Sequence, residues 1–382
     1  MATLCAATTL ARKPTKPMNK AQRAIFMSQL MWPVGSTIRI YIYDYSKIQI
    51  IPRSTYERYV TENENLIKQK KNPSRDLRDY MFWYDFSYVS SDDLDKYFDP
   101  LYKSVQGKVS PGQLIKSVVM ERLAPLVNLK FEFTQDINDS FIRIQFDSTK
   151  GCNSLIGTDN KKASQGLALN KSKTDPTMNF AWLDVATVLH EFCHALGMQH
   201  EHQNPNNNPI QWNIPAIECF YKVKDGWDDK TVKSNIIEKL KTEETNGSNF
   251  DRASIMIYAF PKTMPEWVQG CSGNLTLNGY HTDPNYRLSN TDIQWLGYIY
   301  PMSGNRDPNF VKNLPKDVIP TDIFNPENVS DVAVQVRVFF QNNWKTIVGV
   351  IGGIIGMYIL YLVVKSLTRA REQSYQPRYR LY

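Results

Sequence analysis

A dense cluster of histidines constrains this chain more than any other feature of its sequence. Four of its five histidines lie between His190 and His202. Apolar residues before and within the cluster recur at helical spacing, which predicts a helix over about Asp184–Leu196. Side chains four residues apart on a helix share one face. His190 and His194 are therefore predicted to reach the same ion.

Three further residues complete a pattern that suits a metal ion. Glu191 lies about 100° around the helix from His190, where its carboxylate can meet a water held by the ion. Gly197 lets the backbone leave the helix sharply, because glycine tolerates a positive φ angle. His200 can then supply a third nitrogen from outside the helix. Three nitrogen ligands and one open position suit a catalytic zinc, whereas a structural zinc takes a fourth protein ligand.

Two other interpretations of the cluster compete with the zinc site. The histidines could belong to a solvent-exposed helix, or they could be core residues satisfied by hydrogen bonds. The spacing HExxHxxGxxH, on a helix that ends at its own glycine, favours zinc because it is the metzincin signature. Cys193 is adjacent to His194 but points to another side of the helix, so we expect it to pack in the core.

The segment from His190 to Glu201 resembles the zinc motif of astacin-like metallopeptidases, a family of the metzincin clan, and is most similar to its microbial and viral-type members. The resemblance covers about Trp32–Pro301, although residues 47–110 contain no segment that resembles the family. Shorter segments on either side also resemble the family: Gly151–Gly157, Met178–Leu183, His200–Pro205, Ser254–Tyr258 and Leu288–Tyr300.

The resemblance implies a fold and a set of roles. The fold would be α+β, with a two-lobed catalytic domain in which a twisted mixed sheet and the zinc helix precede an irregular C-terminal lobe. One Zn²⁺ per chain would be held by His190, His194 and His200. Glu191 would be the general base, and Tyr258 an additional ligand or a transition-state donor. Structural support would come from Met256, Gly197 and Glu201.

The resemblance also implies a protein or peptide substrate. It would lie extended and add itself as a strand to the sheet edge near Ser154–Leu169. In the family, the counterpart of Cys152 usually has a disulfide partner just before the zinc helix, but residues 153–192 contain no cysteine. The five cysteines are widely spaced, which excludes a cysteine zinc ribbon and a dense disulfide scaffold. One or two disulfides and a reducing compartment both remain compatible with the sequence.

Other elements are predicted from periodicity. Alternating apolar residues indicate strands at Trp32–Tyr45, Leu129–Thr134 and Phe141–Phe146. Helical spacing indicates helices at Pro111–Leu126 and Ser289–Tyr300, and Ser289 with Asp292 matches an N-terminal capping signature. Residues 203–213 read as a loop, and residues 47–110 show no clean period.

An uncharged stretch near the end of the chain predicts a membrane anchor. Ile347–Val364 contains 18 residues and would span about 27 Å as a helix, close to the apolar thickness of a bilayer. The alternative is a buried core helix, but the segment is apolar all round and is bracketed by Trp344 and basic residues. The Gly349/Gly353 spacing suits close pairing of two such helices in a homodimer.

Charge is concentrated at the two ends. Residues 1–30 carry a net charge of +5 and residues 365–382 carry +4, whereas the whole chain carries +7, so the part between them is at −2. Nucleic acid is therefore an unlikely partner. The predicted domains are a basic, disordered arm at 1–30, an astacin-like catalytic domain at 31–303, a spacer at 304–343, a transmembrane helix at 344–365 and a basic tail at 366–382.

Together these patterns predict a membrane-anchored, zinc-dependent metalloendopeptidase with a single-pass C-terminal anchor. Peptide bonds would be hydrolysed by a water that zinc activates and Glu191 deprotonates. The alternative is a catalytically retired membrane or envelope protein on a metzincin fold, and the retained Glu191 favours the enzyme. The sequence leaves open which side of a viral or host membrane carries the catalytic domain, because the basic tail and the absence of a recognisable signal peptide point to opposite sides.

Overall fold

The computed structural model describes residues 29–302 apart from 85, 87–88, 106, 168–171, 241–244 and 247–248, and it also describes the backbone of 6–8 and 26–27. The chain divides into two compact units, of which the larger comprises Met1–Asp85 and Ser91–Asn325. Every helix, strand and side-chain contact described below belongs to the larger unit. The smaller one comprises Phe86–Ser90 and Pro326–Tyr382.

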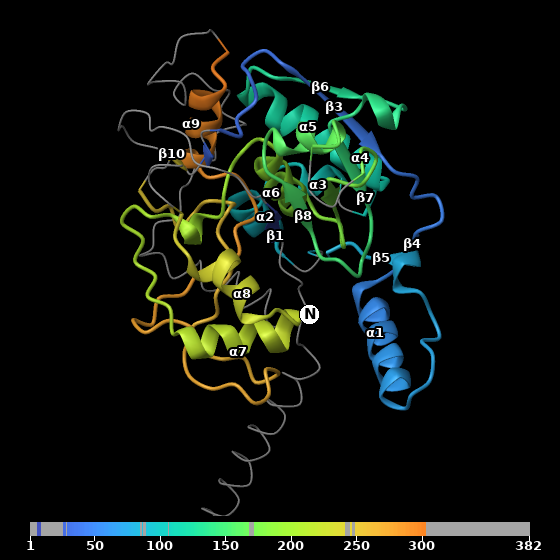
Figure 1. Cartoon of the computed structure of the whole chain (residues 1–382), viewed down its shortest axis with the longest axis vertical. Coiled ribbons are helices and arrows are strands. Elements are labelled where there is room, and N and C mark those ends of the chain that lie inside the picture. The colour runs from blue at the N-terminus through green and yellow to red at the C-terminus, as the bar shows by residue number, and fades with distance from the viewer. Residues whose placement is uncertain are drawn as a thin grey trace, which may run out of the picture. The chain divides into compact units, whose positions relative to one another are not determined.

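A mixed sheet forms the first part of the larger unit (Figure 1). Its strands pair in parallel except for one antiparallel pair, β8 with β9. The spatial order is β1 (Ala6–Thr8), β8 (Asn153–Leu155), β9 (Met178–Asn179), β7 (Ile142–Gln145), β3 (Thr37–Ile42) and β6 (Lys130–Phe133). Two small ribbons pair β10 (Thr245–Asn246) with β2 (Phe26–Met27), and β4 (Gln49–Ile50) with β5 (Tyr80–Met81).

Helices cover the sheet and make up most of the regular structure after it. Figure 1 shows α6 between the strands β3, β6 and β7 and the segment that carries α7 and α8. The α-helices are α1 (Arg53–Lys68), α2 (Ser91–Tyr97), α3 (Tyr102–Val105), α4 (Pro111–Ser117), α5 (Asp159–Ser164), α6 (Val185–Ala195), α7 (Ile214–Asp225), α8 (Asp229–Val232) and α9 (Asn290–Ile299). Two π-helical turns cover Val118–Leu123 and Lys233–Ile237, and 3₁₀ turns cover Leu77–Asp79, Ala124–Leu126, Ile137–Asp139 and Glu201–Gln203.

The elements predicted from periodicity are confirmed. In β3, Ile38 and Ile40 are fully buried while Arg39 between them reaches the surface, as alternation requires. The predicted helix at Pro111–Leu126 is helical throughout but changes from α to π to 3₁₀ geometry. The capping signature before α9 is a complete capping box formed by Ser289 and Asp292.

Residues 47–110, which periodicity does not place, include the long helix α1 and its flanking strands. Only Tyr56 and Asn63 of α1 are buried, so the helix lacks a continuous apolar stripe. Asn63 anchors it by polar contacts instead: its side-chain nitrogen donates to the Arg75 carbonyl at 2.8 Å, and its oxygen accepts from the Ser74 amide at 3.1 Å. A helix held in this way gives no hydrophobic period in the sequence.

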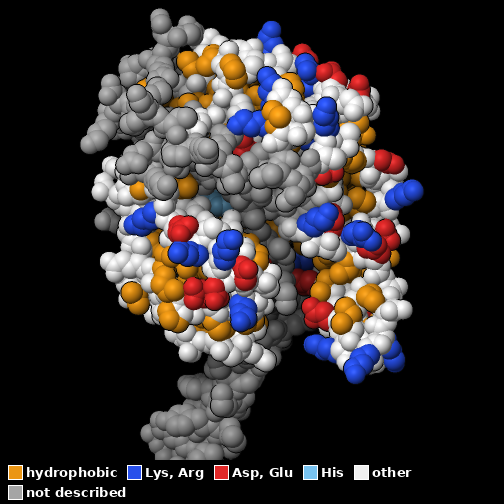
Figure 2. All heavy atoms as spheres, in the orientation of Figure 1, with side chains coloured by type: hydrophobic (Ala, Val, Ile, Leu, Met, Phe, Trp, Pro, Cys, Tyr) orange, Lys and Arg blue, Asp and Glu red, His pale blue; other side chains and the backbone are white. Residues whose placement is uncertain are grey.

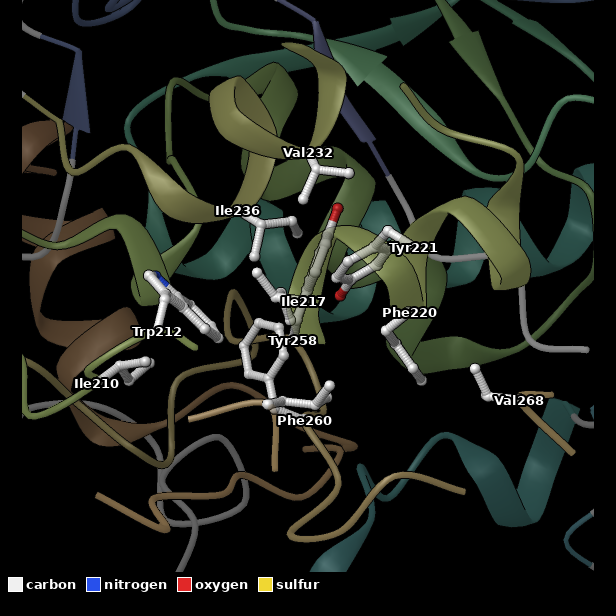
Figure 3. Packing of buried hydrophobic residues seen from close by; sticks show 11 residues of the cluster. Ile210, Trp212, Ile217, Phe220, Tyr221, Val232, Ile236, Tyr258, Phe260 and Val268 are labelled. Atoms are coloured by element: carbon white, nitrogen blue, oxygen red, sulfur yellow. The ribbon is translucent and has the colours of Figure 1, made fainter. Parts of the chain in front are cut away.

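Besides the buried side chains of the sheet, such as Ile38 and Ile40, a second apolar cluster lies in the part of the chain that follows the histidines (Figure 3). A disulfide joins Cys219 of α7 to Cys271, 52 residues later in the sequence. The sequence was compatible with one or two disulfides, and the structure contains the disulfide Cys219–Cys271. Cys152 and Cys193 are buried and form no disulfide. The cluster consists of Ile210, Trp212, Ile217, Phe220, Tyr221, Val232, Ile236, Tyr258, Phe260, Val268 and Leu275.

The sheet edge predicted to receive substrate differs from expectation in two ways. Among the described residues of this region, only Asn153–Leu155 forms a strand, because Asp159–Ser164 forms the helix α5. The outer edge of β8 is also paired: Ala6, Ala7 and Thr8 lie parallel to Asn153, Ser154 and Leu155. The opposite edge of β8 is occupied by β9.

On the face shown in Figure 2, basic and acidic side chains of the described residues are interspersed. Among those residues, no helix combines the length and the hydropathy that crossing a bilayer requires. The predicted anchor Ile347–Val364, the spacer and the basic tail lie outside the described residues, as does most of the N-terminal arm.

Candidate active site

The histidine cluster begins on α6, and Asp184 fixes the start of this helix. The Asp184 carboxylate accepts hydrogen bonds from the Thr187 amide at 2.8 Å and from the Tyr102 hydroxyl at 3.0 Å. Such a cap satisfies amide groups that have no partner inside the helix. The helix packs against β8 and against the π-helical turn Val118–Leu123. Both His190 and His194 are consequently buried.

Gly197 ends α6 in the way the sequence predicts. Its φ angle is +103°, a conformation that residues with a Cβ atom rarely adopt. The Gly197 amide donates to the His194 carbonyl at 2.8 Å, and the Met198 amide donates to the Cys193 carbonyl at 2.9 Å. This pair of bonds is a Schellman motif, which closes the helix and redirects the chain. The redirected backbone brings His200 back beside the helix.

The structure brings the three predicted ligands together. One ligand atom from each of His190, His194 and His200 lies within 4.8 Å of the others, and all three side chains are buried. The Nε2 atoms of His194 and His200 are 3.0 Å apart. His190 Nε2 is buried and has no hydrogen-bond partner among the described residues. The nitrogens thus converge on one point.

Backbone carbonyls orient two of the three rings. His190 Nδ1 lies 2.8 Å from the Ile255 carbonyl oxygen, and His194 Nδ1 lies 2.8 Å from the Met198 carbonyl oxygen. A carbonyl oxygen can only accept, so each Nδ1 carries the proton and each Nε2 presents its lone pair. This is the tautomer that binds a metal ion through Nε2.

Burial keeps the three imidazoles neutral. It lowers the pKa of His190 to about 4 and lowers the pKa values of His194 and His200 well below their usual value. Neighbouring histidines lower the last two pKa values further. Neutral rings are the form that ligates a metal. Three buried neutral nitrogens, with one of them lacking any other partner, fit a zinc ion.

The other predicted site residues lie around these ligands. Glu191 follows His190 on α6 and is fully buried. Met256 is also fully buried, in the turn whose Ile255 carbonyl contacts His190. The ring of Tyr258 has its centroid 4.3 Å from that of His200 and 6.2 Å from that of His190.

Glu201 supports the loop that follows His200. Its carboxylate oxygen Oε1 accepts from the Asn204 side chain at 2.7 Å and from the Asp251 amide at 2.8 Å. Its own amide donates to the Met256 carbonyl at 3.0 Å. Burial raises the pKa of Glu201 well above its usual value. The residue therefore links the third histidine to the turn at Met256.

One neighbour of the site had no role in the sequence-based prediction. His202 is buried, and its ring centroid lies 5.0 Å from that of His200 and 4.7 Å from that of Tyr258. Its Nε2 lies 2.9 Å from the Asn235 carbonyl oxygen, in the π-helical turn Lys233–Ile237. The sequence shows a fourth histidine in the cluster, but only the fold shows that it packs against Tyr258.

Comparison with known proteins identifies related sequences over part of the chain. Residues 117–269 match the model of the Astacin peptidase family. Zinc metalloproteinase nas-36 of Haemonchus contortus is 25% identical over 130 residues, which are 34% of this chain and 18% of that protein. The chain thus spans less than a fifth of this relative's length. The predicted resemblance to astacin-like peptidases is confirmed.

Two solved structures are also similar. Myroilysin is 23% identical, with a TM-score of 0.47 over 73% of this chain and 98% of the myroilysin chain. High choriolytic enzyme 1, a hatching enzyme zinc-protease from Oryzias latipes (medaka fish), is 14% identical, with a TM-score of 0.35 over 74% of this chain and 96% of that one.

The family match and the geometry agree with the predicted fold and the predicted cofactor. The mixed sheet followed by the histidine helix fits the α+β, astacin-like fold predicted from the sequence. Astacin peptidases use one zinc, and His190, His194 and His200 form a group that could hold it. The predicted cofactor, one zinc ion per chain, is confirmed.

Proposed function

We propose that this chain, whose residues 117–269 match the astacin family, is a zinc metalloendopeptidase. The observation that supports this activity best is the convergence of three buried histidines, the first of which is followed directly by the buried Glu191. Three protein ligands leave a zinc ion one open position, as in catalytic rather than structural zinc sites. A protein or peptide is the substrate that such a site would hydrolyse.

The side chains divide the work of hydrolysis. Zinc held by the three imidazoles would supply Lewis acidity, which polarises a carbonyl and lowers the pKa of a bound water to about 7. Glu191 takes a proton from the attacking water and delivers it to the nitrogen of the leaving amine. The new carbon–oxygen bond forms first, as the π electrons of the carbonyl move to its oxygen. The carbon–nitrogen bond breaks when these electrons return and the nitrogen receives the proton, and one water is consumed.

Tyr258 is proposed to stabilise the transition state. Its ring lies against that of His200, so its hydroxyl belongs to the same buried surroundings as the ligands. A hydroxyl placed there can donate a hydrogen bond to the carbonyl oxygen as that oxygen gains negative charge. Met256, Gly197 and Glu201 support the ligands through the turn and helix end described above.

The test uses the purified full-length chain, a peptide library and a zinc chelator. We expect cleavage that the chelator abolishes and added zinc restores. Glu191→Gln should retain zinc, measured by elemental analysis, and lose activity by at least about 100-fold, the smallest usual contribution of a general base. His194→Ala is the matched comparison and should lose the metal itself. A zinc-loaded wild-type chain without activity on any peptide would support the retired protein instead.

We further propose that the enzyme is anchored in a membrane through Ile347–Val364. The support is the sequence itself: 18 uncharged residues with basic residues after them. The full-length chain should sediment with membranes after alkaline washing and be released by detergent, whereas a variant ending at residue 343 should stay in the supernatant. Sedimentation of both variants would overturn the proposal.

The side of the membrane that carries the catalytic domain can be determined by protease protection in sealed membranes. Pairing of two chains through Gly349 and Gly353 should be weakened by Gly353→Ile, measured by crosslinking in the membrane.

A further inference from the structure

The turn that carries Met256 contacts the metal ligands on one side. The Ile255 carbonyl oxygen lies 2.8 Å from His190 Nδ1. The Met256 carbonyl accepts from the amide of Glu201, the residue directly after His200, at 3.0 Å. Two consecutive carbonyls of the turn thus contact the first ligand and the neighbour of the third.

On its other side the turn contacts a single carboxylate from α9. Asp292 is 1% exposed. Its Oδ1 accepts from the Ser254 hydroxyl at 2.7 Å, and its Oδ2 accepts from the Ile255 amide at 2.9 Å. The Ser254 hydroxyl in turn accepts from the Met256 amide at 3.1 Å. The amide groups of Ile255 and Met256 are therefore both held, one directly and one through Ser254.

These contacts exceed what capping of α9 requires. Within the capping box, Asp292 Oδ2 accepts from the Ser289 amide at 2.9 Å, which already satisfies that end of the helix. The bonds to Ser254 and Ile255 leave the helix and reach a segment 37 or 38 residues away in the sequence. A carboxylate can accept all three hydrogen bonds because its two oxygens offer about four acceptor sites.

We propose that Asp292 is a positioning residue for the metal centre. Its carboxylate holds the amide of Ile255, and the carbonyl of the same residue orients the ring of His190. The inference rests on the proposed zinc enzyme and adds α9 to the structure that supports its ligands. Residues that orient metal ligands typically change metal affinity by about 10–100-fold when they are altered.

The test compares the zinc affinity of full-length variants by competition with a chromophoric chelator. Asp292→Ala removes all three acceptor contacts and leaves the Ile255 amide without its partner. Because Asp292 acts through the turn and not on His190 directly, we expect the zinc affinity to fall by about tenfold, at the low end of the usual range. The visible absorption spectrum of the Co²⁺-substituted protein should shift as well, because it reports the geometry of the ligands.

Two further variants separate positioning from helix capping. Asp292→Asn keeps one oxygen for the amides of Ile255 and Ser289 and an amide group facing Ser254, so it should restore most of the zinc affinity. Ser289→Ala removes the hydroxyl that caps the Asp292 amide at 3.0 Å and donates to Asp251 at 2.7 Å, but it removes none of the contacts that Asp292 makes with Ser254 and Ile255. It should lower the thermal midpoint of the zinc-free protein without changing the zinc affinity or the Co²⁺ spectrum.

The outcomes are distinguishable. If wild-type protein binds no zinc, the proposed function fails. If wild type binds zinc and Asp292→Ala binds it equally well, or if Ser289→Ala weakens binding to the same extent, only the positioning role is overturned. Should Asp292→Ala not fold, Ser254→Ala replaces it, because it removes the contact at Oδ1 and the acceptor of the Met256 amide while leaving both contacts at Oδ2 in place. A several-fold loss of zinc affinity in that variant supports the role, and an unchanged affinity overturns it.

Discussion

The ring of Tyr258 packs against both histidine rings and apolar side chains. One face of its surroundings is formed by histidines, with His200 at 4.3 Å and His202 at 4.7 Å between ring centroids. The other is formed by the second apolar cluster, which includes Trp212 and Phe260 (Figure 3). The ring is therefore held by packing, whereas the proposed chemistry belongs to its hydroxyl.

The variant Tyr258→Phe keeps the packed ring and removes only the hydroxyl, the proposed hydrogen-bond donor. We expect kcat to fall by about 100-fold, as for the loss of one oxyanion donor, with zinc content and thermal stability close to wild type. Steady-state kinetics and elemental analysis on the same preparation check both parts. Loss of zinc, or an unchanged kcat, would contradict the assigned role.

Among the secondary-structure elements, the turn between β8 and α5 connects α6, which carries His194, to the segment that contains Leu30. The Gly157 amide donates to the carbonyl of His194 at 2.9 Å, and the Thr158 amide donates to the carbonyl of Leu30 at 2.8 Å. Gly157 has a φ angle of +48°, and a Cβ atom there would lie 1.9 Å from the Leu30 carbonyl oxygen. The turn thus needs glycine both for its conformation and for its close contact.

We expect Gly157→Ala to lower the free energy of unfolding by about 3 kcal/mol, from backbone strain together with overpacking. Gly226→Ala is the matched control: Gly226 ends α7 at a φ angle of +69° with nothing within 4 Å of the added carbon. For Gly226→Ala, the free energy of unfolding should fall only by the cost of backbone strain, about 1 kcal/mol. Urea denaturation of both variants measures the difference, and equal losses would show that the contact with Leu30 is unimportant.

At the scale of the whole molecule, the disulfide and the β1–β8 pairing join distant parts of the chain. The disulfide between Cys219 and Cys271 spans 52 residues of sequence, which include most of the second apolar cluster. Such a loop restricts the unfolded chain, which is worth about 4 kcal/mol. Reductant should therefore lower the thermal midpoint of wild type. The double variant Cys219→Ser, Cys271→Ser should have the lower midpoint with or without reductant, and a wild-type midpoint insensitive to reductant would contradict the stabilising role.

The pairing of β1 with β8 affects access to the sheet edge. Ala6–Thr8 and an extended substrate would compete for the same backbone groups of Asn153–Leu155, because β9 covers the other edge. A variant lacking residues 1–28 should therefore have a higher kcat/KM on peptides. The factor by which kcat/KM rises should equal the inverse of the fraction of wild-type molecules in which the outer edge of β8 is unpaired. An equal or lower kcat/KM would mean that substrate does not use this edge.

The sequence predicted the elements whose signals are local. The helix over Asp184–Leu196, its end at Gly197 and the capping of α9 were found because helical period, positive-φ glycine and capping residues act within a few positions. It did not predict α1, whose anchor Asn63 bonds to residues 11 and 12 positions away rather than through an apolar stripe. The disulfide was left undetermined because spacing alone does not say which cysteines meet.

By itself, the sequence determined the metal-binding group: which three histidines and which carboxylate belong together, since all lie within one helix and the turn that ends it. The tertiary structure alone decided how that group is held. The Ile255 carbonyl at His190, the Asp292 carboxylate behind it, the ring of His202 on Tyr258 and the strand beside β8 come from segments far apart in the sequence. Such contacts leave no period or short motif, because they form only when the packed core brings those segments together.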